Sequence, residues 1–303
     1  MDLTCTRVLV TGAAGFLGSH VCHALVRAGF DVTGLVREQT DLTRIRDIAG
    51  RMDVRALRPG PPSLSLFGNN GFDAVIHAAT NYGRAGSANS DLVADNILFP
   101  LALCEAHDQR GGRALFVNID SFFSRPAEES RYLLPYVTTK RHFREWLALR
   151  PPESVTVSLR LEHVYGPDDS PQKFVPWLLK QLTMDPPVCI PLTTGEVRRD
   201  FVYVADVTAA IITVLKTAGR HLPGVTDLEV GTGEPITVRN FVETAHALAQ
   251  SRAVLQFGAV AERAGEIRSS RANTSALRHL GWTPLFSPTQ GLNQCLSVNG
   301  GEI

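Results

Sequence analysis

Short apolar runs alternate with helical patterns along the first half of the chain. Runs rich in β-branched residues predict six strands, at Arg7–Thr11, Asp31–Val36, Val54–Leu57, Ala74–His77, Ala114–Asn118 and Val155–Leu161. Apolar positions recur at helical spacing in three segments between them, Gly15–Ala28, Val93–His107 and Tyr136–Leu149. This alternation is typical of a parallel sheet covered by helices, so the sequence predicts an α/β, doubly wound fold.

The pattern changes after Tyr165-Gly166-Pro167, where shorter elements are separated by prolines. This region predicts a smaller lobe over the carboxyl edge of the sheet, where doubly wound folds bind ligands. We therefore expect residues 1–162 to form the sheet domain, with a further contribution from about 201–232. Residues 163–303 are expected to form mainly the C-terminal, ligand-binding lobe.

A glycine-rich turn directly follows the first predicted strand. Gly12, Gly15 and Gly18 stand three residues apart between the apolar run and the helical pattern. Such glycines allow a tight turn and let a pyrophosphate approach the amides at a helix N-terminus. The same glycines also serve plain packing of a strand against a helix, but their place after the first strand favours a dinucleotide.

The end of the second predicted strand bears on the choice of dinucleotide. NAD enzymes of this layout place an acidic residue there, whereas this chain has Val36 followed by Arg37. A carboxylate would repel a 2′-phosphate, and a guanidinium group would bind it with paired charged hydrogen bonds. The sequence therefore predicts NADP(H); an exposed arginine in an arginine-rich chain is the alternative interpretation.

Tyr136 and Lys140 lie four residues apart in a predicted helix, on one face. The chain has four Lys against 26 Arg, so a lysine at this spacing is notable. A tyrosine beside a lysine can transfer a proton near neutral pH, which an arginine supports less well. Two solvated side chains on an amphipathic helix would show the same spacing.

Composition narrows the class of protein. The chain has 303 residues, 44% of them apolar, and 30 basic residues balance 30 acidic ones, which gives no support for nucleic acid or a membrane surface as partner. Five cysteines without a C-x-x-C pair indicate neither a disulfide framework nor a metal site. With no signal-peptide pattern and no apolar run of membrane-spanning length, we expect a cytoplasmic protein.

Taken together, these motifs resemble the extended short-chain dehydrogenases/reductases, in particular the branch that acts on nucleotide sugars. The resemblance runs from about Arg7 to Leu292. Besides the glycine motif and the Tyr–Lys pair, it is carried by Asp73–Ala79, Asp95-Asn96, Leu159–Pro167, Gly195–Val207, Arg263–Ile267 and Leu280–Pro284. It implies a Rossmann sheet domain, a nucleotide-sugar substrate and a homodimer built by the helices near 93–107 and 136–149. These helices carry apolar residues beyond what one sheet face needs, which include Phe99, Leu103, Phe143, Trp146 and Leu147.

The chain departs from that family at the hydroxyl that usually polarises the substrate carbonyl. Ile119 occupies one plausible position for it, and Ser121 is the nearest replacement, while Ser124 is expected to be a bystander. The sequence from Asn118 to Phe123, together with Arg160–His163, is similar to that of the abequose- and paratose-synthase-like 4-ketoreductases. Ser121 also stands where the dehydratases of the family have an acidic residue beside the hydroxyl.

The resemblance implies a catalytic trio. Tyr136 would donate the proton, Lys140 together with oxidised cofactor would bring its pKa toward neutrality, and Ser121 would donate to the developing alkoxide. Expected cofactor-binding residues are Gly12, Ala14, Gly15, Phe16, Leu17, Gly18, Arg37, Ala78, Ala79, Asn96, Tyr136, Lys140, Leu161 and His163. Expected substrate-binding residues are Thr80, Tyr82, Ser121, His163, Lys173, Phe174, Arg199 and Arg263.

The reaction implied is NADPH-dependent reduction of the 4-keto group of a nucleotide-linked 6-deoxyhexose. One alternative is an epimerase or dehydratase with tightly bound NAD on the same scaffold. A second is a regulator that senses NADP(H) without turnover. For single residues, structural roles stay open: a buried structural histidine at His163, and surface ion pairs at Arg199 and Arg263.

Overall fold

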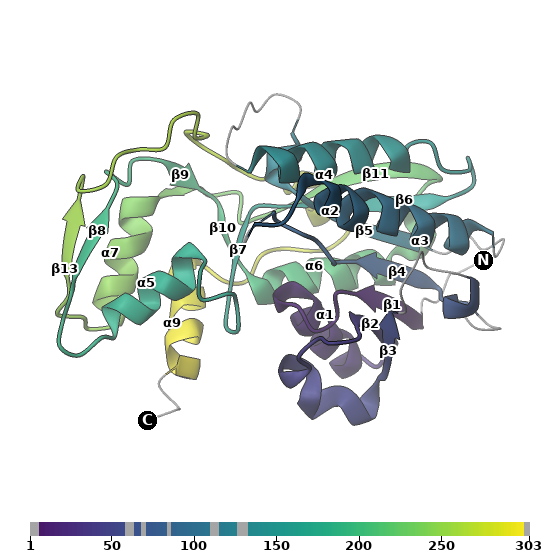
Figure 1. The fold of residues 1–303 in the computed structure, drawn as a ribbon, viewed down its shortest axis with the longest axis horizontal. Coiled ribbons are helices and arrows are strands. Elements are labelled where there is room, and N and C mark those ends of the chain that lie inside the picture. The colour runs from purple at the N-terminus through teal and green to yellow at the C-terminus, as the bar shows by residue number, and fades with distance from the viewer. Residues whose placement is uncertain are drawn as a thin grey trace.

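A seven-stranded, fully parallel sheet forms the centre of the molecule (Figure 1). The computed structural model describes residues 6–57, 64–67, 71–83, 86–109, 115–125 and 133–299. The strands run in the order β3 (Asp53–Leu57), β2 (Asp31–Arg37), β1 (Arg7–Thr11), β4 (Ala74–His77), β5 (Leu115–Ser121), β6 (Val155–Leu161) and β11 (Gly224–Val230). The order reverses between β1 and β4, so the predicted doubly wound fold is confirmed.

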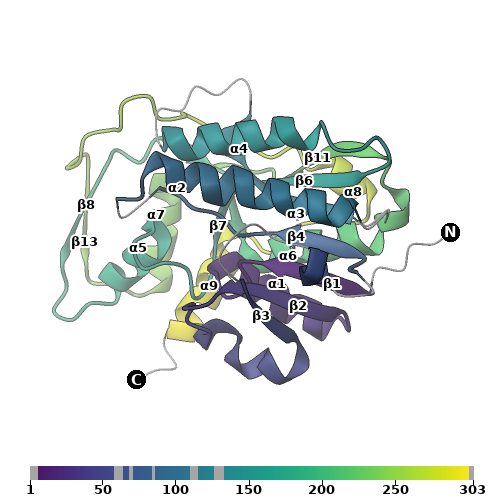
Figure 2. The same cartoon turned by 45° about the vertical axis from the view of Figure 1, so that its right-hand side comes forward.

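Helices cover both faces of this sheet (Figure 2). One face carries α1 (Phe16–Arg27) and α6 (Val204–Lys216), and the other carries α2 (Asn89–Val93), α3 (Phe99–Asp108) and α4 (Leu134–Leu147). Successive residues of a strand point to opposite faces. Along β1, Val8 and Val10 therefore join the core under α1 and α6, while Leu9 joins the core under α3 and α4.

The predicted elements match the structure closely in the first half of the chain. All six predicted strands are present, although Ala114, the expected start of β5, lies outside the described residues. Strand β5 continues to Ser121, three residues past its predicted end, because its polar last residues still pair with β6. Short helical turns at Thr43–Arg51, Leu64–Phe67, Phe122–Ser124 and Ala218–Arg220 complete the connections.

The remaining elements form a second packing unit around its own apolar core. Helices α5 (Phe174–Leu182), α7 (Val238–Leu248) and α9 (Pro288–Asn299) pack with the paired strands β8 (Cys189–Leu192) and β13 (Val254–Phe257). Two further pairs, β7 (His163–Tyr165) with β10 (Phe201–Tyr203) and β9 (Arg198–Arg199) with β12 (Ile236–Thr237), lead into this lobe. These features support a division near residue 162, which stays a prediction.

Two features tie the lobe to the sheet. Leu277 in α8 (Ser275–His279) and Trp282 pack into the main core, although they belong to the C-terminal part of the chain. The buried Asp200 carboxylate accepts hydrogen bonds from the backbone of Thr232 (2.7 Å) and Ala272 (3.1 Å). It thereby joins the start of β10 to the chain that leaves β11 and to the chain that enters α8.

The helices expected to form a dimer differ in part from expectation. Leu103, Phe143 and Leu147 are at most 2% exposed because they pack against the sheet, so naming them as surplus apolar surface was wrong. Trp146, 46% exposed, and Leu98, 58% exposed, are apolar and face solvent on the same helical layer. Among the described residues, no helix is long and apolar enough to cross a bilayer.

Candidate active site

A cavity of about 1770 Å³ lies over the carboxyl ends of the sheet strands and extends to the second lobe. Residues at or just after the ends of β1, β2, β4, β5 and β6 line it, and the lobe contributes the opposite wall. Every residue that the sequence suggested for cofactor, substrate or catalysis lines this cavity, except Asn96. Sequence motifs that are distant along the chain therefore converge on one space.

The glycine-rich turn brings the end of β1, the start of α1 and the backbone of Ala79 close together. Gly12 has φ +67°, and a Cβ atom on it would lie 2.9 Å from the backbone of Ala79. A Cβ atom on Gly18 would collide with the carbonyl oxygen of Gly12, so helix and strand can approach this closely only with glycine. The first turn of α1 holds no acidic residue, and no described side chain caps it. Its amides suit an anion, and the residues fit a dinucleotide.

One end of the cavity lies beside the end of β2. Val36 is buried and Arg37 is exposed, and both line the cavity. Arg44, which sequence analysis missed, also lines this end, and its guanidinium group contacts the carbonyl oxygens of Ala14 (3.4 Å) and Asp168 (3.0 Å). The sequence signal for Arg44 was a second arginine shortly after β2. The sequence could not show that its side chain reaches the cavity, because that depends on the turn between strand and arginine.

Tyr136 lies in the cavity wall as a buried phenol. Its ring packs on that of Tyr82, with 4.8 Å between ring centroids. Burial raises the pKa of Tyr136 well above its usual value, Tyr82 and Asp120 raise it further, and a hydrogen bond with Ser121 lowers it in part. The side chains alone therefore hold a neutral phenol. That Lys140 and oxidised cofactor together bring its pKa toward neutrality stays a prediction. A neutral phenol is the form that donates a proton.

Lys140 is buried behind Tyr136. Its Nζ donates to the carbonyl oxygen of Ile119 at 2.8 Å and lies 6.0 Å from the centre of the Tyr136 ring. Burial lowers the pKa of Lys140, and the neighbouring carboxylate of Asp120 raises it. Position 119 thus contributes a backbone oxygen to Lys140, and Ser121 is the hydroxyl beside Tyr136.

Asp120 is a site residue to which sequence analysis gave no role. It lines the cavity, and Ser124 Oγ donates to its Oδ2 at 2.6 Å. Burial raises the pKa of Asp120, while Lys140 and Ser124 lower it. Ser124, which we expected to be a bystander, has a buried hydroxyl that bonds to the carboxylate beside Lys140, and its role in activity stays a prediction. An acidic residue at the end of an apolar strand was the signal that pointed to it.

Asn96 stands behind the cavity wall and braces it. It lies in the π-helical turn Ala94–Leu98 that joins α2 to α3, a distortion that often marks functional sites. Its Oδ1 accepts from the amide of Asn81 (2.7 Å), and its Nδ2 donates to the Asn81 carbonyl (2.8 Å) and to Thr139 (3.0 Å). Asn96 therefore links the loop after β4 to the helix that carries Tyr136.

The lobe side of the cavity is basic and aromatic. Lys173 pairs with Asp169 (2.8 Å), and its ammonium group lies 5.1 Å from the ring centre of Phe16 in the glycine-rich turn. Arg199 is buried, and its guanidinium group is held by Glu266 (2.8 Å) and the Ile267 carbonyl (2.6 Å). The other predicted substrate residues that line this space are Thr80, Tyr82, His163, Phe174 and Arg263.

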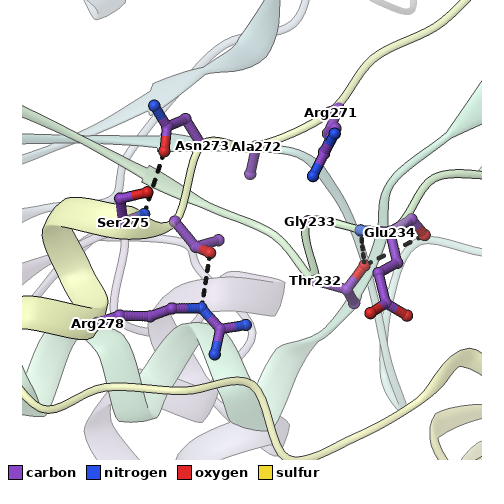
Figure 3. A pocket seen from close by; sticks show the side chains of 9 residues that line it. Thr232, Gly233, Glu234, Arg271, Ala272, Asn273, Ser275 and Arg278 are labelled. Carbon is purple, nitrogen blue, oxygen red and sulfur yellow. Dashed lines mark hydrogen bonds between the residues drawn. The ribbon is translucent and has the colours of Figure 1, made fainter.

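A second hollow, of about 570 Å³, lies near the start of α8 (Figure 3). Arg271 and Arg278 lie on opposite sides of it in Figure 3, and their guanidinium groups do not point toward one another. Arg278 donates to Thr274 (3.0 Å), and the Ser275 amide donates to Asn273 (3.2 Å). In this hollow, the polar groups of Arg278, Asn273 and Ser275 are used in bonds to neighbouring residues. We therefore take the larger cavity as the candidate site.

The chain is similar to known proteins over most of its length. Residues 8–229 match the model of the NAD dependent epimerase/dehydratase family. The chain is 33% identical over 298 residues to CDP-abequose synthase of Salmonella muenchen, covering 96% of this chain and 97% of that protein. It is 23% identical to dTDP-4-dehydro-6-deoxyglucose reductase of Escherichia coli, with 98% of each protein covered.

Solved structures share the fold over nearly the whole chain. UDP-glucose 4-epimerase of Thermotoga maritima, determined with UDP-glucose, superposes with a TM-score of 0.81 at 21% identity, covering 98% of this chain and 99% of that one. UDP-glucose 4-epimerase of Thermus thermophilus, determined with NAD, gives a TM-score of 0.77 at 24% identity, covering 98% and 100%.

Replacing Asn96 tests its bracing role. In Asn96→Ala, the amide and carbonyl of Asn81 lose their partner, so the free energy of unfolding is expected to fall by about 2 to 3 kcal/mol. Urea denaturation measures this, and hydrogen exchange at the Asn81 amide should become faster. The exposed Asn89→Ala is the control and is expected to stay within about 0.5 kcal/mol. Equal stability of the two variants would contradict the bracing role.

Proposed function

The chain belongs to the NAD dependent epimerase/dehydratase family of extended short-chain dehydrogenases/reductases, and within it we propose that this protein reduces the 4-keto group of a nucleotide-linked 6-deoxyhexose with NADPH. The observation that carries the proposal is the buried, neutral Tyr136 phenol next to the Ser121 hydroxyl, with Lys140 behind it. Identity of 33% and 32% to two CDP-abequose synthases supports a reductase of deoxysugar nucleotides.

The cofactor would extend from the glycine-rich turn to Tyr136. The amides at the start of α1 would hold its pyrophosphate, Arg37 and Arg44 would lie at its adenosine end, and Lys140 would hold the nicotinamide ribose. A bound nicotinamide would supply the hydride that reduces the sugar carbonyl. Arg37 supports NADPH rather than NADH, because the strand ends in Val36 and Arg37 where NAD enzymes of this layout place an acidic residue.

The protein would supply the proton and the stabilisation of developing charge. As the carbonyl carbon accepts the hydride, its oxygen becomes negative, and the Ser121 hydroxyl would donate a hydrogen bond to it. Tyr136 would transfer its proton to that oxygen, leaving a phenolate beside Lys140, which is positively charged. The Ile119 carbonyl and Asp120 would keep the ammonium group of Lys140 in place behind the phenol.

The lobe would hold the nucleotide diphosphate of the substrate. Arg199 and Arg263 line the cavity opposite the sheet, and guanidinium groups match diphosphate oxygens in geometry and charge. Lys173 lies between the lobe and the glycine-rich turn, where it would face both ligands. We also place the protein in the cytoplasm, since the described cysteines Cys22, Cys104, Cys189 and Cys295 are all free thiols.

Tyr136→Phe tests the proton donor. The variant is expected to bind NADPH and sugar nucleotide normally and to lose a factor of about 10² to 10⁴ in kcat, because only the transferable proton is removed. NADPH oxidation with a CDP-linked 4-keto-6-deoxyhexose measures it. Tyr203→Phe, outside the cavity, is the matched control and should keep full activity. A fully active Tyr136→Phe would refute the mechanism, and sugar interconversion without NADPH oxidation would indicate an epimerase.

The raised pKa of Tyr136 also predicts a pH dependence. Burial disfavours the phenolate, so the proton-donating form persists through neutral and mildly alkaline pH. The kcat/KM of reduction is therefore expected not to fall up to about pH 9 through ionisation of Tyr136. A loss of activity with a midpoint near neutrality that vanishes in Tyr136→Phe would contradict this.

Arg37→Ala tests cofactor choice. Loss of the guanidinium group should weaken NADPH binding about 10- to 100-fold and leave NADH binding unchanged, because only NADPH carries the 2′-phosphate. Fluorescence titration with both nucleotides measures the two dissociation constants. Arg46→Ala removes the same charge from an exposed residue outside the cavity and serves as control. Equal affinity of the unmodified protein for NADPH and NADH would contradict the assignment of NADPH as the preferred cofactor.

We further propose a twofold homodimer through the helical layer of α3 and α4. Leu98 and Trp146 provide exposed apolar area there, which association would bury. Light scattering is expected to give twice the chain mass of 33.0 kDa. Trp146→Glu should give the monomer, whereas Leu285→Glu, at an exposed leucine outside this layer, should leave the dimer intact. A monomeric unmodified protein at micromolar concentration would disprove the dimer.

A further inference from the structure

Two neighbouring residues at the end of β6 turn buried polar atoms toward each other without bonding. Oε2 of Glu162 and Nδ1 of His163 lie 4.0 Å apart, and neither makes a hydrogen bond to any described residue. The hydroxyl of Ser270 is also buried and makes no hydrogen bond of good geometry, although it is near enough to lower the pKa of Glu162. Buried polar atoms are rarely left unpaired, so three in one place indicate a function.

His163 connects this cluster to the candidate active site. Its side chain is 28% exposed and lines the cavity, and its ring packs between Phe122 (4.5 Å between centroids) and Phe201 (6.0 Å). Burial, with a contribution from the nearby Arg199, lowers the pKa of His163 to about 3. The imidazole is therefore neutral, with one nitrogen protonated, and the bond at Nδ1 decides whether Nε2 donates or accepts.

Glu162 can either accept a hydrogen bond from Nδ1–H of His163 or donate one to Nδ1. Its side chain is fully buried, and Nη2 of Arg125 donates to its Oε1 at 2.6 Å. Burial raises the pKa of Glu162 to about 7, Arg125 lowers it, and Asp200 raises it. Arg125 also binds the carboxylate of Glu229 (3.1 Å), so its charge is shared between two acids. Both forms of the Glu162 carboxyl group are thus present near neutral pH.

We propose that Glu162 is a positioning residue that fixes the tautomer of His163 and thereby sets the hydrogen bond that Nε2 of this histidine offers to the sugar of the bound substrate. The carboxylate accepts Nδ1–H, directly or through one water that also meets Ser270, and leaves Nε2 as an acceptor for a sugar hydroxyl. The protonated acid donates to Nδ1 and turns Nε2 into a donor. The identity of the ligand rests on the proposed function, whereas the coupling between Glu162 and His163 does not.

The sign of the pH effect follows from the carboxyl group. As pH rises through about 7, Glu162 loses its proton, and the proton of His163 moves from Nε2 to Nδ1. For a sugar hydroxyl that donates its proton to Nε2, substrate binding is therefore expected to improve on the alkaline side. The groups that face the pair are Arg125, Arg199, Asp200 and Ser270, of which the two arginines stay charged throughout.

Nitrogen-15 NMR of the histidine rings in the ligand-free protein tests the coupling. The signals of His163 are identified as those that disappear in His163→Gln. In the unmodified protein, the Nδ1 signal should change from that of an unprotonated to that of a protonated nitrogen as pH rises. The Nε2 signal should change in the opposite way, and both changes should have a midpoint near pH 7. In Glu162→Gln, which keeps the shape and cannot titrate, both signals should stay constant. Glu229→Gln removes the same charge from the same arginine without facing His163, and it should keep the transition. Ring signals of the unmodified protein that stay constant across neutral pH would overturn the proposal.

Kinetics then test the link to the substrate. KM for the sugar nucleotide should rise about tenfold as pH falls below 7 in the unmodified protein, with kcat less affected, since one hydrogen bond is lost. In Glu162→Gln, KM should be independent of pH because the amide oxygen accepts Nδ1–H throughout. A pH-dependent KM in Glu162→Gln would overturn the substrate link. An NMR transition in a protein without reductase activity would disprove the proposed function and leave the coupling standing.

Discussion

The parallel direction of all seven strands is the constraint on which the site depends. Because every strand ends at the same edge, residues far apart in the chain meet there, from Gly12 after β1 to His163 after β6. The reversal of strand order between β1 and β4 sends their crossovers to opposite faces and leaves a crevice between the two loops. The end of β5, with Ser121 and the carbonyl of Ile119, lines the same cavity.

Burial, rather than charge, dominates the chemistry of this edge. Tyr136 and Lys140 both lie in the wall with little exposure, and both are pushed toward their neutral forms. The carboxylate of Asp120 raises the pKa of Lys140 and so favours its charged form, whereas the hydrogen bond with Ser121 lowers the pKa of Tyr136 and so favours its phenolate. The chain thus holds a neutral phenol beside a buried lysine whose ammonium form the carboxylate of Asp120 favours.

The sequence predicted what depends on local pattern. Strand periodicity and the glycine spacing are properties of neighbouring residues, and they placed the sheet and the tight turn after β1 correctly. Asp120 and Arg44 were missed because each depends on a partner in another element. Assigning Leu103 and Phe143 to a dimer failed for a similar reason, since helical spacing identifies an apolar face and not what covers it.

The repeated passage of the chain between its two cores has a consequence for folding. Strand β11 pairs with β6, and α6 shares a face with α1, although both follow the entry into the lobe. Trp282 returns to the sheet core before α9 joins the lobe core. A fragment that ended at residue 162 would lack one edge strand and half of one helical layer. The two cores are therefore interlaced, and they should melt as one cooperative unit rather than as separable modules.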